Sequence, residues 1–180
     1  FSLRYIYYGP GAFVFRNTSN VLIEDVRIFN FGGMGFVILP RCSDFTFNRL
    51  EIVPKEPDIH HYSTLADGIH TTGLGGKLVI KNSVFRNLGD DTLNCHSQIM
   101  KAKNVSSDKI EIYCDKKKPH ISPYWCAKGD ILRVYDCKTY KQKGNIAVES
   151  FEDNIITTTT AHEVNAEDFI INDSFRPEVL

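Results

Sequence analysis

The segment VLIEDVRI at residues 21–28 is followed, 24 residues later, by FTFNRLEI at residues 45–52. Apolar side chains occupy the same positions in both segments, and a polar turn precedes each of them. Alternating apolar and polar residues, β-branched and aromatic runs and Asn/Ser/Gly corners predict strands rather than helices. A repeat of roughly 20–30 residues made of short strands predicts a parallel β-solenoid. In that fold Val21 lies over Phe45, and Ile23 lies over Phe47.

A third copy of the repeat spans residues 77–85. Its Leu78 lies 33 residues after Phe45 of the second copy, so nine additional residues fit an insertion around residues 54–63. The alternative fold is an ordinary β-sandwich with evenly spaced hairpins, which would pair these segments antiparallel. Side-chain types match position by position, and not only in spacing, which favours the solenoid. The fold class predicted from the residues is therefore all-β.

The repeat disappears after about Ser97. The following region has strand candidates at residues 109–113, 130–135 and 154–160, separated by turn and charge clusters such as residues 116–118 and 141–144. This composition predicts an antiparallel β-module, a small barrel, inserted between turns of the solenoid. Residues 168–176 resemble residues 79–86, so the chain is expected to return to the solenoid. The predicted organisation is residues 1–100 solenoid, 101–164 inserted module and 165–180 solenoid.

Composition excludes some classes of function. The formal net charge is −1 and the basic residues are scattered, so nucleic acid is not an expected partner. No apolar stretch is long enough to span a membrane, and no signal peptide is visible. The chain does not begin with Met and ends soon after the insert, so we expect it to be a segment of a longer protein.

The five cysteines are odd in number and lack CxxC spacing, so neither a disulfide framework nor a zinc site is indicated. Cys42 and Cys95 are interpreted as small buried residues of the solenoid. Pairing among Cys114, Cys126 and Cys137 stays open.

Two of three neighbouring carboxylates follow the same 24-residue period. Asp67 and Asp91 are separated by 24 residues, so in a solenoid they stack on adjacent turns, about 4.8 Å apart. Asp90 is the neighbour of Asp91, and its side chain is expected to point away because successive strand residues alternate between faces. Hydrolysis of a glycoside with inversion needs one carboxylic acid and one or two carboxylates that hold a water. Asp67 and Asp91 suit the water, and Asp90, set apart by about 6.5–9.5 Å, suits the acid.

Polar residues in the same register surround these carboxylates. His70 and Asn94 are 24 residues apart, and His96 follows on the same side of an extended strand; we interpret all three as substrate-binding. Three alternatives stay open: the Asp pairs are turn residues, the stacked Asp residues bind calcium, or the histidines are structural.

These motifs resemble glycoside hydrolase family 110. The similarity is densest from Gly9 to His96 and is carried by the segments YGPG at 8–11, GGMG at 32–35, ADGIH at 66–70, GGK at 75–77, NSVF at 82–85 and DDTLNCH at 90–96, with KGD at 128–130 in the insert. Cys95 and Ser97 depart from the family pattern, which more often has Val and Gly there. A looser resemblance links the Asp layout to the polygalacturonases of family 28.

The resemblance implies a right-handed parallel β-helix of the pectin-lyase-like kind with an inserted β-barrel. It implies an inverting exo-α-1,3-galactosidase that needs no metal or other cofactor, with Asp90 as general acid and Asp67 and Asp91 as bases. The substrate would be a terminal α-1,3-linked galactose, in linear Galα1-3Gal or blood-group-B-type glycans, and the location periplasmic or secreted. The alternatives are a pectin-type hydrolase or Ca²⁺-dependent lyase, and a non-catalytic carbohydrate-binding solenoid.

Overall fold

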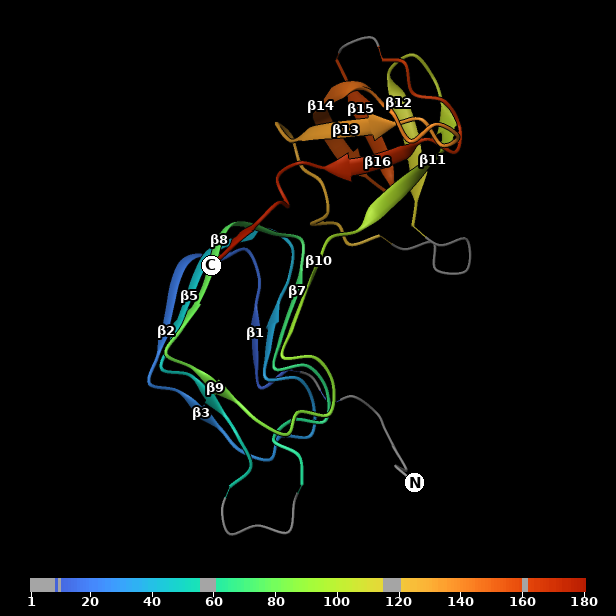
Figure 1. Ribbon diagram of the computed structural model, residues 1–180. Helices are drawn as coiled ribbons and strands as arrows, with labels where there is room; N and C mark the ends of the chain where they lie inside the picture. The colour runs from blue at the N-terminus through green and yellow to red at the C-terminus, as the bar shows by residue number, and fades with distance from the viewer. Residues whose placement is uncertain (1–8, 10, 56–60, 115–120, 160–161) are drawn as a thin grey trace, which may run out of the picture. The chain divides into compact units, whose positions relative to one another are not determined.

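A computed structural model describes residues 9, 11–55, 61–114, 121–159 and 162–180 of the chain. The regular elements in these ranges are all β-strands, as predicted. The chain divides into two compact units, residues 1–96 with 177–180 and residues 97–176 (Figure 1). Within the described ranges, no helix has the length and hydrophobicity of a membrane span. Tyr8, Pro10, Thr160 and the lysines at 116–118, all used above, lie outside them.

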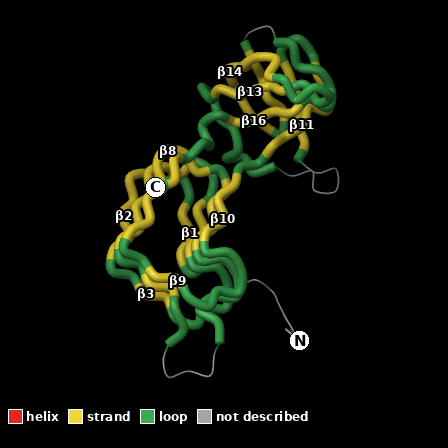
Figure 2. Tube along the Cα trace, viewed as in Figure 1, coloured by secondary structure: helices red, strands yellow, loops and turns green. Residues whose placement is uncertain are grey.

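In the first unit, successive passes of the chain contribute parallel strands to three sheets (Figures 1 and 2). The first sheet has the order β1 (Phe13–Phe15), β4 (Phe36–Ile38), β7 (Ile69–Thr72), β10 (Leu93–His96). The second has the order β2 (Ser19–Glu24), β5 (Cys42–Asn48), β8 (Leu74–Lys81), β17 (Glu178–Val179). The third has the order β3 (Arg27–Ile28), β6 (Glu51–Ile52), β9 (Val84–Phe85). Antiparallel pairing of the repeats, as in a β-sandwich, is therefore wrong.

The register of the repeats is the one predicted from the sequence. Val21 pairs with Phe45 and Ile23 with Phe47 in the β2–β5 ladder. Phe45 and Phe47 are completely buried, and Phe47 packs edge-on against Phe36 at a centroid distance of 5.0 Å. These rings, which come from strands of two different sheets, fill the space between the sheets.

Left-handed backbone positions also stack. Asn20 near the start of β2 and Asp44 near the start of β5 occupy equivalent positions in adjacent turns, with φ angles of 56° and 58°. Asn and Asp tolerate this left-handed conformation better than other non-glycine residues, which explains the polar turn of each repeat. The insertion lies where it was predicted. Ile28 pairs with Ile52, and Phe31 forms a β-bridge with Thr64. The extra residues therefore lie between Ile52 and Thr64.

The second unit is a closed antiparallel barrel with strand order β11-β12-β15-β14-β13-β16. Trp125, Met100 and Leu132 are among its buried core residues. The bounds of its strands are β11 (Ile99–Val105), β12 (Lys109–Tyr113), β13 (Ile131–Tyr135), β14 (Gln142–Glu152), β15 (Ile155–Thr158) and β16 (Phe169–Asn172).

Three details differ from the sequence analysis. Residues 142–144, interpreted as part of a turn, begin β14, the longest strand, because antiparallel pairing with β13 satisfies their backbone regardless of their polarity. Phe169–Asn172, expected in the solenoid, is β16 and closes the barrel; its alternating pattern is common to any half-buried strand. The chain returns to the parallel sheets only at β17, which pairs with β8, so the chain passes from one unit to the other after residue 96 and again after residue 176.

All five cysteines are free thiols, so Cys114, Cys126 and Cys137 form no disulfide with one another. Cys42 is buried as predicted, and its burial raises the pKa of its thiol. Cys95 is exposed, which corrects the prediction that it is buried. The reason is its place on β10, the edge strand of the first sheet.

Candidate active site

Asp67 and Asp91 lie in register at the starts of two neighbouring strands. Gly68 donates its backbone N–H to the carbonyl oxygen of Asp91 at 2.9 Å, and Ile69 pairs with Leu93. In the turn before, Gly35 donates to the carbonyl oxygen of Asp67 at 3.0 Å. The spacing of 24 residues therefore becomes a direct stacking of two aspartates, as predicted.

The three predicted carboxylates come together. One carboxyl oxygen each from Asp67, Asp90 and Asp91 lies within 4.8 Å of the other two. Asp67 is buried, with 4% of its surface exposed, whereas Asp90 and Asp91 are exposed. A cluster of this kind can share protons, hold a water molecule or bind a cation.

Asp90 is not set apart from the other two, which corrects that part of the prediction. The prediction assumed that Asp90 and Asp91 point to opposite faces of a strand. Both residues lie in the bend and loop before β10, which begins at Leu93. Strand alternation therefore does not apply to them.

His70 is a direct polar neighbour of the buried Asp67 carboxylate. Its Nδ1 atom lies 2.6 Å from Oδ2 of Asp67, and its side chain is 20% exposed. With Asp67 ionised, Nδ1 carries a proton and donates it, so the Nε2 atom of neutral His70 presents a lone pair. The motif Asp-Gly-Ile-His thus builds an aspartate–histidine pair within a single turn.

The other predicted binding residues are on β10. Asn94 is the ladder partner of His70. His96 pairs with Thr72, and its Nε2 atom lies 3.2 Å from Nε2 of His70. The structure therefore brings His70 and His96 into contact, and Asn94 lies on the adjacent strand opposite His70.

Thr72 is a site residue that the sequence analysis missed. Its hydroxyl oxygen lies 3.4 Å from Nε2 of His70 and 3.3 Å from Nε2 of His96. The signal was present, because Thr72 stands 24 residues before His96 and two residues after His70.

No family model matches the chain. It is 25% identical to α-1,3-galactosidase A of Akkermansia muciniphila over 177 residues, which are 94% of this chain and 29% of that protein. It is 31% identical to α-1,3-galactosidase B of Bacteroides fragilis over 93 residues, 51% of this chain and 15% of that protein. For α-1,3-galactosidase B of Bacteroides thetaiotaomicron the identity is 29% over 145 residues, 79% and 23% of the two chains.

The chain therefore spans less than a third of the length of these curated relatives. It is distantly similar to bacterial α-1,3-galactosidases, and this similarity relates it to glycoside hydrolases.

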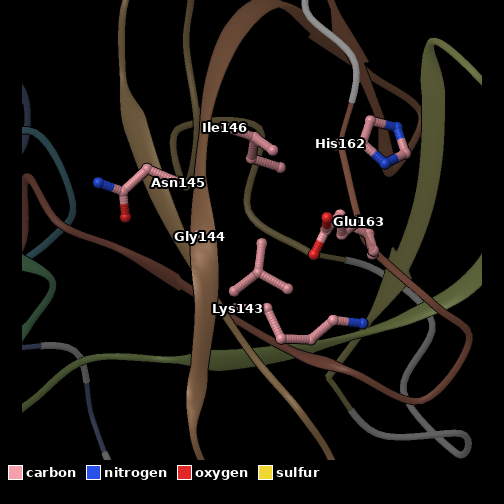
Figure 3. A pocket seen from close by; sticks show the side chains of 8 residues that line it. Lys143, Gly144, Asn145, Ile146, His162 and Glu163 are labelled. Atoms are coloured by element: carbon pink, nitrogen blue, oxygen red, sulfur yellow. The ribbon is translucent and has the colours of Figure 1, made fainter.

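A hollow in the barrel unit has a different chemistry (Figure 3). Its volume is about 310 Å³, and residues 143–146 of β14 and 162–164 line most of it. The ammonium group of Lys143 lies 2.7 Å from the buried carboxylate of Asp168, so its charge is neutralised. Among the described residues that line it, Glu163 is the only acidic one, whereas three carboxylates lie together in the first unit.

Proposed function

We propose that the first unit carries the catalytic carboxylates of an inverting exo-α-1,3-galactosidase. The observation that carries the proposal is the convergence of Asp67, Asp90 and Asp91 within 4.8 Å from two stacked turns. The distant similarity to α-1,3-galactosidases supports it and suggests a terminal α-1,3-linked galactose as the substrate. We assign the three parallel sheets to a right-handed, pectin-lyase-like β-helix with the barrel as its insert, and infer a periplasmic or secreted location by the same resemblance.

In the proposed mechanism, Asp67 and Asp91 hold a water molecule between adjacent turns and remove its proton during attack. The attack is on the anomeric carbon, and Asp90 protonates the leaving oxygen on the opposite side of the sugar. His70 keeps the Asp67 carboxylate in one orientation through the 2.6 Å contact. Rigid parallel strands suit this task, because backbone hydrogen bonds set the spacing of both bases.

Inversion requires the acid to stand about 6.5–9.5 Å from the base. In the free protein, the carboxyl oxygens of Asp90 and of the two bases lie closer, within 4.8 Å of one another. The proposal therefore includes a change in Asp90: the galactose ring enters between the carboxylates and displaces its side chain. Asp90 is exposed and lies in the bend before β10, so its side chain can change rotamer without moving a strand.

His70, Asn94 and His96 are proposed to contact the sugar hydroxyl groups. Neutral imidazole and amide groups both donate and accept hydrogen bonds, as hydroxyl recognition requires. Their common location on β7 and β10 puts them beside the carboxylates.

A second candidate, a Ca²⁺-dependent pectin-type lyase, is favoured by one observation. Three carboxylate oxygens within 4.8 Å are a suitable cation site. A lyase also needs a basic residue that removes a proton from a uronate. Lys81, one candidate, ends β8 in the second sheet, whereas the carboxylates adjoin the first.

The test uses the complete protein that carries this chain and the disaccharide Galα1-3Gal. Asp→Asn at residues 67, 90 or 91 should each lower the rate of galactose release by at least about 10²–10⁴-fold, while circular dichroism stays unchanged. Asp25→Asn is the matched control, since Asp25 forms an exposed ion pair with Arg49 elsewhere in the unit. Proton NMR should show β-galactose first, and EDTA should leave activity intact.

Each failure has a distinct meaning. Release of α-galactose first would contradict inversion but not hydrolysis. Loss of activity with EDTA and recovery with Ca²⁺ on a uronate polymer would move the assignment to the lyase. Carbohydrate binding without hydrolysis would support the non-catalytic solenoid.

A further inference from the structure

Three side-chain atoms beside the carboxylates form a nearly equilateral triangle. Nε2 of His70 and Nε2 of His96 are 3.2 Å apart. The hydroxyl oxygen of Thr72 lies 3.4 Å from the first nitrogen and 3.3 Å from the second. The three residues come from β7 and β10, whose backbone ladder pairs Thr72 with His96.

These distances fit a metal site better than a hydrogen-bonded cluster. Hydrogen bonds in proteins are most often about 2.7–3.0 Å long, so all three edges are longer than usual. Ligand atoms bound to zinc at about 2.0–2.1 Å in tetrahedral geometry lie about 3.3–3.4 Å from one another. The observed edges of 3.2–3.4 Å match one face of such a tetrahedron.

Asp67 supplies the support that a metal-binding histidine needs. Its Oδ2 atom lies 2.6 Å from Nδ1 of His70. Histidine ligands usually donate the second ring N–H to a carboxylate, which fixes the tautomer and directs the lone pair of the other nitrogen at the metal. His96 is exposed, so the outer side of the triangle is open to solvent for a fourth ligand.

We propose that His70 and His96, with the Thr72 hydroxyl as third donor, form a binding site for a divalent transition-metal ion such as Zn²⁺ or Co²⁺. Imidazole nitrogen suits these ions, whereas Ca²⁺ and Mg²⁺ prefer oxygen ligands. A water molecule completes the tetrahedron. The ion is not a cofactor for hydrolysis, because it binds His70, the residue that contacts the catalytic base Asp67. It therefore inhibits the α-galactosidase, and this clause alone rests on the proposed function.

The primary experiment measures metal binding and not activity. The complete protein, stripped with EDTA and dialysed, is titrated with Zn²⁺ by calorimetry, and its Co²⁺ complex is recorded by visible absorption. We expect the intense d–d bands of tetrahedral Co²⁺, displaced by Zn²⁺. His96→Ala and His70→Ala should each weaken binding at least tenfold, and Asp67→Asn by about 10–100-fold. His61→Ala, an exposed histidine outside the triangle, should bind as the wild type does.

Several results would overturn the proposal. A weak octahedral Co²⁺ spectrum in the wild type would do so without any variant, which matters if a variant fails to fold. Zn²⁺ binding that survives His96→Ala but is lost in Asp90→Asn would assign the ion to the carboxylates. Thermal unfolding checks that His96→Ala, at an exposed edge position, retains the fold.

The inhibition is tested separately. Zn²⁺ should lower the release of galactose from Galα1-3Gal by at least tenfold at saturation, and EDTA should restore it. If the protein does not hydrolyse this substrate at all, the proposed function fails while the binding result stands. If it hydrolyses the substrate and saturating Zn²⁺ has no effect, the inhibitory role is wrong.

Discussion

Gly89 precedes Asp90 and Asp91, and we predict that Gly89→Ala damages both the fold and the site. A Cβ atom at this position would lie 2.5 Å from the carbonyl oxygen of Leu65 and 2.8 Å from its carbonyl carbon. Both atoms are backbone atoms of the neighbouring turn, so no flexible side chain can move aside. To reach ordinary contact, the two backbones would have to separate by roughly 1 Å.

The expected magnitude follows from two effects. Forcing an extra carbon into a packed position costs about 1–3 kcal/mol. The same separation weakens the hydrogen bond that Gly89 N–H donates to the carbonyl oxygen of Thr64 at 2.8 Å, which costs about 0.5–1.5 kcal/mol. The free energy of unfolding should therefore fall by about 1.5–4.5 kcal/mol. Because a misplacement of about 1 Å can cost about 10²-fold in rate, galactose release should fall by about that factor.

Urea unfolding followed by circular dichroism measures the stability, and hydrolysis of Galα1-3Gal by the complete protein measures the proposed activity. Gly32→Ala is the matched control, since a Cβ at Gly32 meets nothing within 4 Å. That substitution should be neutral or stabilise the protein by up to about 1 kcal/mol. The reasoning is refuted if Gly89→Ala unfolds within about 0.5 kcal/mol of the wild type and keeps its activity.

Two further predictions concern other positions. Gly76→Ala should destabilise the first unit by at least about 1–2 kcal/mol, because Gly76 has a φ of +63° and its Cβ would lie 2.3 Å from Asp44 Oδ1. In an Asp44→Ala background, urea unfolding should show a smaller loss of stability. An equal loss of stability would mean that the carboxylate is not the obstacle. Burial and the hydrogen bond to Glu167 raise the pKa of Tyr113 from 10.0 to about 12. The neutral phenol therefore contributes its full stabilisation of the barrel below pH 10. This contribution is lost as the pH rises to about 12. Ultraviolet titration of the phenol should show the midpoint moving toward 10 in Glu167→Gln, and an unchanged midpoint would contradict the assigned cause.

Much of the first unit and the location of the carboxylates were predictable from the sequence. In parallel strands that stack in register, a fixed spacing along the chain becomes a neighbour in space. The pairing of Val21 with Phe45 and the stacking of Asp67 on Asp91 both follow from 24-residue intervals. The barrel was less predictable, because each antiparallel strand pairs according to the closure of the whole sheet. For that reason β14 and β16 were misassigned.

By itself, the sequence determined the repeat, the register and which residues share a turn. Only the tertiary structure decided the directions of side chains that lie outside the strands. Asp90 was expected to point away and instead joins the other carboxylates, because a bend does not obey the alternation of a strand. The contact of His70 with Asp67 and the triangle with His96 and Thr72 likewise depend on side-chain rotation about fixed backbone positions. Spacing along a chain specifies backbone neighbours, whereas the packing around each side chain selects its rotamer.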